Sequence, residues 1–100
     1  MSLEEFESYW RDVHVPITLA HDLILEYRVG LVRELVEAPD LEFDGYAILG
    51  YADREAWEAD GRTPESLVSR DDVPNFLASN RSLVIEETWY RVSSSAGAAR

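Results

Sequence analysis

The sequence predicts an α+β domain in which helices pack on one face of an antiparallel sheet. Three observations support this fold class: a capped amphipathic helix at the start, three runs with strand character, and helical segments between the last two runs. The length of 100 residues suits one domain. We expect it to span residues 1–92, with a flexible C-terminal tail of small residues over 93–100.

The first expected element is a helix that begins after Ser2. Ser2 and Glu5 have the spacing of a capping box, in which each side chain bonds the other residue's backbone N–H. Pro16 predicts the end of the regular helix, because the residue before a proline is displaced from the α region. We therefore expect residues 17–24 to be a connector. The apolar stripe of the helix consists of Leu3, Phe6, Trp10, Val13 and Ile17.

Three runs of residues predict strands. A period of two begins near Leu25 and predicts a long strand as far as Val36. Residues 45–52, GYAILGYA, are apolar on both faces, which is typical of a covered strand. Residues 81–92, RSLVIEETWYRV, predict the last strand. Three apolar strands exceed what the few helices can cover, so we expect a second copy of the chain to cover the rest.

Helical segments separate the last two of these strands. Asp53 is expected to cap a helix that Gly61 ends, and Thr63 to start a shorter one. Residues 71–78, DDVPNFLA, add a helical turn. The predicted core consists of Phe6, Trp10, Val13, Leu31, Ile48, Trp57 and Leu83.

Composition excludes several classes of function. The net charge is −11, and the nine basic residues are all arginines, so a polyanion such as a nucleic acid or an anionic membrane surface would be repelled. The absence of cysteine excludes disulfides and thiolate chemistry. No apolar run is long enough to span a bilayer, and no secretion signal opens the chain, so we expect a cytoplasmic protein.

The first helix resembles that of a known family. The pattern F-x-x-Y-W-x-x-x-H-x-P, at Phe6, Tyr9, Trp10, His14 and Pro16, is similar to the signature of the EthD family, and the later strands follow in the family's order. The resemblance implies a ferredoxin-like protomer and a homodimer that forms a dimeric α/β-barrel. Family members usually carry a strand before this helix, and we expect the chain to differ from them in lacking that usual first strand.

His14 is the strongest candidate for chemistry. An imidazole titrates near neutrality and moves protons in either direction. His14 follows Trp10 by one helical turn, so we expect it on the side of the helix that faces the sheet. The resemblance implies more, because relatives include polyketide cyclases, isomerases and decarboxylases that move protons on aromatic or enolic substrates without a cofactor. The alternative is a structural histidine at a helix C-terminus, bonded to the backbone.

Aromatic residues are candidates for contacts with a small hydrophobic or aromatic ligand. We expect Tyr9, Trp10 and Tyr27 to bind it and Tyr51 to assist catalysis, with a tyrosine hydroxyl holding the developing enolate oxygen. The alternative is that these residues only fill the core and the dimer interface.

The remaining polar residues carry weaker expectations. His21 lies beside Asp22, but adjacent side chains rarely face each other, and two histidines without suitable spacing predict no metal site. We expect no metal and no cofactor. The acidic clusters LEEFE, EAPDLEFD and SRDD predict solvated faces and helix caps. Two functions stay open: a cofactor-independent enzyme of polyketide or aromatic metabolism, and a non-catalytic ligand- or haem-binding accessory protein with the same barrel.

Overall fold

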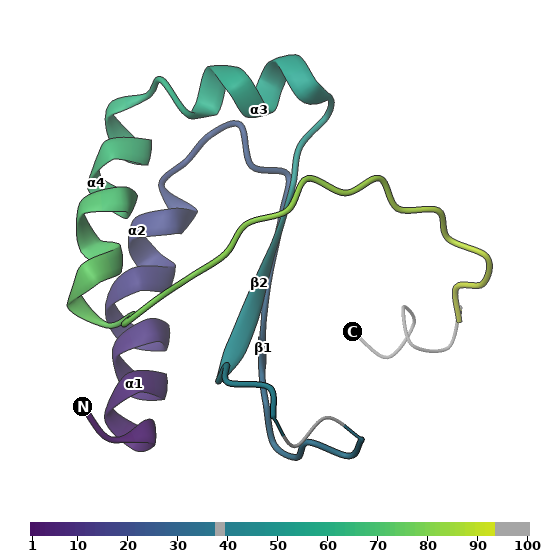
Figure 1. The fold of residues 1–100 in the computed structure, drawn as a ribbon. Helices are drawn as coiled ribbons and strands as arrows, with labels where there is room; N and C mark the ends of the chain where they lie inside the picture. The colour runs from purple at the N-terminus through teal and green to yellow at the C-terminus, as the bar shows by residue number, and fades with distance from the viewer. Residues whose placement is uncertain (38–39, 94–100) are drawn as a thin grey trace.

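The structure, a computed structural model, describes residues 1–37 and 40–93. Helices α1, α2 and α4 lie on one side of a two-stranded antiparallel sheet, and α3 lies across one end (Figure 1). This arrangement confirms the α+β class. The elements in chain order are α1 (Leu3–Tyr9), the π-helical turn η1 (Trp10–His14), α2 (Val15–Leu19), β1 (Glu26–Leu31), β2 (Gly45–Gly50), α3 (Arg54–Asp60), α4 (Pro64–Asp72) and the 3₁₀ turn η2 (Val73–Asn75).

The predicted caps are confirmed. Ser2 Oγ accepts from the N–H of Glu5, and Glu5 Oε1 accepts from the N–H of Ser2, each over 3.1 Å. The side chain of Asp53 accepts from the N–H of Ala56 at the start of α3, and Thr63 accepts from the N–H of Ser66 at the start of α4. Each cap satisfies a backbone donor that the first turn of a helix leaves free.

The first helix does not end at Pro16, and that prediction is wrong. The N–H of Val15 bonds the carbonyl of Trp10, five residues back, and the helical run continues through α2 to Leu19. Pro16 lies in the first turn of α2, where a missing N–H is tolerated. The wider π turn keeps Phe6, Trp10, His14 and Thr18 on the inward side at steps of four residues.

Strands β1 and β2 pair antiparallel, with Tyr27 opposite Leu49 and Leu31 opposite Gly45. Strand β1 ends at Leu31, five residues before the predicted end. The described residues between 81 and 92 contain no strand, so that prediction is wrong as well. This segment, which we call the arm, runs away from the helices past the sheet (Figure 1). It contacts the sheet where Arg28 approaches Glu87 at 3.4 Å.

The buried core is an aromatic cluster of Phe6, Trp10 and Phe76, and Val29 and Leu31 pack against it. Burial of Phe6 and Trp10 is confirmed, and Leu31 and Ile48 are half-buried. The core prediction is wrong for Val13, Trp57 and Leu83, which are 38%, 40% and 87% exposed. The π turn directs Val13 outward, Trp57 packs under the guanidinium of Arg54 at the surface, and Leu83 lies on the arm.

Gly45 shows why the helix approaches the sheet so closely. A Cβ at this position would lie 2.8 Å from the ring of Trp10 and 2.7 Å from the carbonyl oxygen of Gly30. A larger residue would therefore push the helix away from β2.

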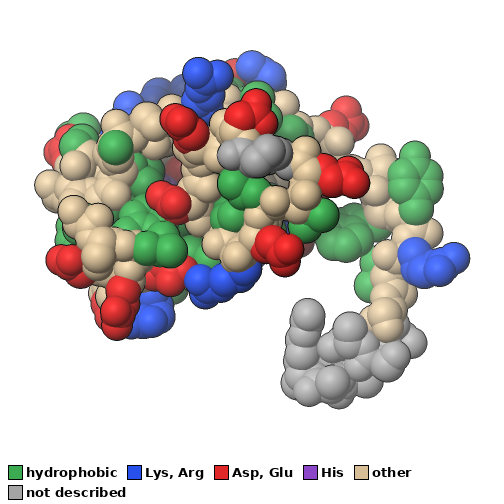
Figure 2. All heavy atoms as spheres, turned by 60° about the horizontal axis from the view of Figure 1, so that its bottom comes forward, with side chains coloured by type: hydrophobic (Ala, Val, Ile, Leu, Met, Phe, Trp, Pro, Cys, Tyr) green, Lys and Arg blue, Asp and Glu red, His purple; other side chains and the backbone are tan. Residues whose placement is uncertain are grey.

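The surface view shows acidic side chains scattered over the face, with hydrophobic groups exposed between them and on the arm (Figure 2). No helix in residues 1–37 and 40–93 is long and apolar enough to cross a membrane. The predicted C-terminal tail lies, after residue 93, outside the described residues.

Candidate functional site

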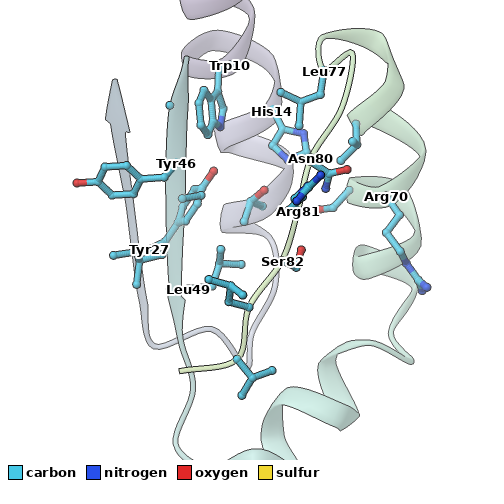
Figure 3. A pocket seen from close by; sticks show the side chains of 18 of the residues that line it. Trp10, His14, Tyr27, Tyr46, Leu49, Arg70, Leu77, Asn80, Arg81 and Ser82 are labelled. Atoms are coloured by element: carbon cyan, nitrogen blue, oxygen red, sulfur yellow. The ribbon is translucent and has the colours of Figure 1, made fainter. Parts of the chain in front are cut away.

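An open hollow lies between the helices and the inner face of the sheet. Trp10 and His14 line it from the first helix, and Tyr27 and Leu49 from the sheet. Residues 80–82 run across it between β2 and α4 (Figure 3). The hollow thus joins apolar walls to a histidine, the combination that small-molecule sites commonly use.

His14 is held by a carboxylate from α4. Its Nδ1 lies 2.8 Å from Oδ2 of Asp72, and the two side chains are 12% and 8% exposed. The ring also packs against Phe76, with centroids 4.8 Å apart. Nε2 has no hydrogen-bond partner among the described residues, where every fully buried side-chain polar atom has one, so Nε2 is open to solvent in the hollow.

Asp72 is the centre of this cluster. Besides His14, its carboxylate accepts from the hydroxyl of Tyr9 at 2.5 Å and from the amide of Asn75 at 3.1 Å. Burial disfavours the charged form, but the three hydrogen bonds outweigh burial and hold the pKa of Asp72 below its ordinary value. The SRDD cluster was expected to be solvated, and for Asp72 that prediction is wrong.

A second histidine lies in the same region. His21 is buried, and its Nδ1 lies 2.9 Å and 3.1 Å from the two carboxylate oxygens of Asp60. Its Nε2 lies 2.7 Å from Oγ of Ser69, and the hydroxyl of Tyr51 donates to Asp60 over 2.8 Å. His21 therefore pairs with Asp60, a carboxylate 39 residues away, and not with the adjacent Asp22.

The hydroxyls of both bonded tyrosines resist ionisation. Burial, and then the hydrogen bond and negative charge of Asp60, raise the pKa of Tyr51 strongly. The hydrogen bond to Asp72 is the main reason that the pKa of Tyr9 is raised. Both hydroxyls therefore stay protonated near neutral pH and act as donors to a carboxylate.

Four of the five predicted site residues lie along the hollow. Trp10, His14, Tyr27 and Tyr51 line the hollow, whereas Tyr9 is not among its lining residues and instead donates to Asp72. The alternative of a helix-end histidine bonded to the backbone does not hold for His14, because the helix continues and the partner is a side chain.

Sequence reasoning missed Asp60, Ser69 and Asp72. One signal was available in α4, where the polar residues Ser66, Ser69 and Asp72 recur every three residues. These residues face inward, while Leu67 and Val68 are 54% and 53% exposed. A helix whose polar stripe faces the interior indicates a polar network there.

The described part of the chain contains no group of three or more His, Asp or Glu side chains arranged to hold a metal ion. The two histidines each bind a single carboxylate through Nδ1. The geometry is that of two carboxylate-oriented imidazoles, an arrangement that fixes the ring and the tautomer.

Comparison with known proteins agrees with this fold. The chain is similar to the crystal structure of an ethyl tert-butyl ether D (EthD) family protein from Bacillus halodurans, with a TM-score of 0.67 and 23% identity, covering 88% of this chain and 87% of that one. No curated protein matches the chain. The family model of the EthD domain matches residues 1–80, well over half of the sequence, and the chain therefore belongs to the EthD family.

Proposed function

We propose that the protein is a small cofactor-independent enzyme that moves a proton on an aromatic or enolic metabolite, with His14 as the base. The observation that carries this proposal is the Asp72–His14 pair, in which Nδ1 is held at 2.8 Å and Nε2 is open to the hollow. A carboxylate on Nδ1 orients the ring and stabilises the imidazolium that forms when Nε2 takes a proton.

The proton transfer has two steps. Nε2 of His14 takes a proton from a carbon next to a carbonyl group, and the electron pair of that C–H bond forms the enolate. The imidazolium then returns the proton to another position of the substrate, which gives an isomer or closes or opens a ring according to the substrate. No outside oxidant or reductant is needed.

A tyrosine hydroxyl is proposed to hold the enolate oxygen. Tyr27 is the better candidate, because it lines the hollow and its hydroxyl has no hydrogen bond within the described residues. Tyr51 is the second candidate, with its hydroxyl directed to Asp60. Trp10 supplies an apolar wall for a flat substrate, and Tyr9 supports His14 through Asp72.

Exchange of an acidic C–H proton tests the proposal. The probe is 2-tetralone in D₂O, followed by NMR with wild-type protein and with His14→Gln. General base catalysis contributes about 10²–10⁴-fold, so the variant should lose at least about 100-fold of the protein-dependent exchange rate. Arg11→Gln is the control, because Arg11 is an exposed residue of the same π turn and should exchange like wild type.

Two results would count against catalysis by His14. Equal exchange by wild type and His14→Gln would remove His14 as the base. A haem titration that gives a Soret band in wild type and none in His14→Gln, without any proton exchange, would favour the accessory binding protein. An open Nε2 on a carboxylate-held histidine also suits an axial ligand.

The proposal includes a homodimer. The sheet has two strands, and its face away from the helices carries Tyr46, which is 54% exposed. The arm adds further exposed apolar side chains, namely Leu83, Val84, Ile85, Trp89, Tyr90 and Val92. Apolar surface of this extent on a chain of 100 residues favours burial against a second copy.

A further inference from the structure

We propose that Ser69, His21 and Asp60 form a second reactive site, in which Ser69 is a nucleophile toward activated acyl compounds such as aryl esters and thioesters. Oγ of Ser69 lies 2.7 Å from Nε2 of His21, and Nδ1 of His21 lies 2.9 Å from Oδ1 of Asp60. The order nucleophile, base and orienting carboxylate is the one that activates a serine hydroxyl.

The hydrogen bonds of this cluster determine where the protons lie. A carboxylate only accepts hydrogen bonds, and Asp60 receives one from the hydroxyl of Tyr51 at 2.8 Å. Nδ1 of His21 must therefore carry a hydrogen toward Asp60, which leaves the lone pair of a neutral ring on Nε2. The hydroxyl of Ser69 then donates to Nε2, so its proton already points at the base.

The three residues come from separate elements that meet at the hollow. His21 follows the end of α2, Asp60 is the last residue of α3, and Ser69 lies in α4. All three line the hollow; His21 and Asp60 are buried, and Ser69 is half-buried. A substrate that enters the hollow can thus reach the hydroxyl, while the base and the carboxylate stay shielded from water.

The reaction needs no further reagent than water. Oγ of Ser69 bonds to the acyl carbon while His21 takes the hydroxyl proton, and the thiolate or phenolate leaves with its bonding electrons and receives that proton. Water then attacks the acyl-serine, gives a proton to His21 and releases the acid, and the proton returns to Oγ. Because Ser69 lies inside a helix, its own N–H is committed to α4, so we restrict the substrates to acyl groups with good leaving groups.

A fluorophosphonate probe tests this site directly. It phosphonylates an activated serine with loss of fluoride, and peptide mass spectrometry locates the modified residue. We expect the native protein to be modified at Ser69, and Ser69→Ala to fall to the background of heat-unfolded protein. Ser66→Ala is the matched control, since Ser66 is a buried serine one turn earlier in α4 and His21 bonds Ser69 instead.

Two further comparisons complete the test. His14→Gln should keep modification at Ser69 and the release of p-nitrophenol from p-nitrophenyl acetate, which separates this site from proton transfer at His14. Absence of modification at Ser69 in folded wild-type protein would overturn the proposal. Equal p-nitrophenol release by wild type and Ser69→Ala would overturn it as well, and the hydroxyl would then only tie α4 to the segment that follows α2.

Discussion

Asp72 links the stability of the fold to the candidate base. Its carboxylate accepts from Tyr9, His14 and Asn75, three side chains from different turns. A buried carboxylate with several donors is stable only in its charged form, because protonation removes acceptors that the donors need. Loss of this charge should therefore affect both the position of the His14 ring and the free energy of unfolding.

We predict that Asp72→Asn weakens proton exchange by about 10–100-fold, the loss that is typical when the carboxylate behind a metal-bound histidine is removed. The folded-state pKa of Asp72 is lowered, so its contribution to stability is complete above the unfolded-state pKa of about 3.9 and is lost as pH falls through the lower folded value. Urea unfolding between pH 2 and 7 measures the free energy of unfolding, which should fall less steeply in acid for the variant than for the wild type.

Asp71→Asn is the matched control for this prediction. Asp71 is the exposed neighbour on the same helix and carries the same charge. If the free energy of unfolding falls equally in acid for wild type and Asp72→Asn, the charge of Asp72 contributes nothing to the pH dependence of stability.

At the scale of elements, the π turn η1 decides which residues face the sheet. A regular helix would continue the stripe from Trp10 to Val13 and Ile17, whereas the wider turn directs Val13 outward and His14 inward. Single π turns occur frequently at functional sites. Here the turn delivers the histidine to the hollow.

The π-helical turn predicts unequal losses of stability for two neighbouring substitutions. Trp10→Ala should lower the free energy of unfolding by about 3–5 kcal/mol, because it removes the largest ring of the aromatic cluster. Val13→Ala should cost about 1 kcal/mol or less, as is usual at exposed positions. Chemical denaturation measures both, and a larger loss for Val13→Ala would contradict the π register.

At the scale of the whole molecule, the sheet and the arm expose apolar side chains that the helices do not cover. Strand β2 is paired on one edge within the described residues, and the strand-forming residues of the arm pair with no strand there. A strand needs a pairing partner to bury its backbone polar groups. A second copy of the chain supplies one in the proposed dimer.

We predict that wild-type protein sediments as a dimer at micromolar concentration, with an interface of roughly 1,200–2,000 Å² in total. The double substitution Leu83→Ser with Ile85→Ser should shift the equilibrium to monomer, because both side chains are exposed on the arm. Leu67→Ser with Val68→Ser removes a similar exposed apolar pair from α4 and should leave the dimer intact. A strictly monomeric wild type would contradict the prediction.

The sequence by itself determined the features that depend on near neighbours. The cap at Ser2, the caps at Asp53 and Thr63, and strand β2 were predicted within one or two residues. These features follow from hydrogen bonds within four residues and from side-chain periods, which a single sequence displays. The pattern around His14 also led to the family, because that motif lies within one helix.

Only the tertiary structure decided the partners of the histidines. Asp72 lies 58 residues from His14 and Asp60 lies 39 residues from His21, so no local spacing reveals these contacts. The turn at Trp10–His14 likewise changes its hydrogen-bond register where Pro16 cannot donate, and the helix packs on Gly45 at the same place. Strand formation in the arm depends on a neighbouring strand, which no property of its own residues can supply.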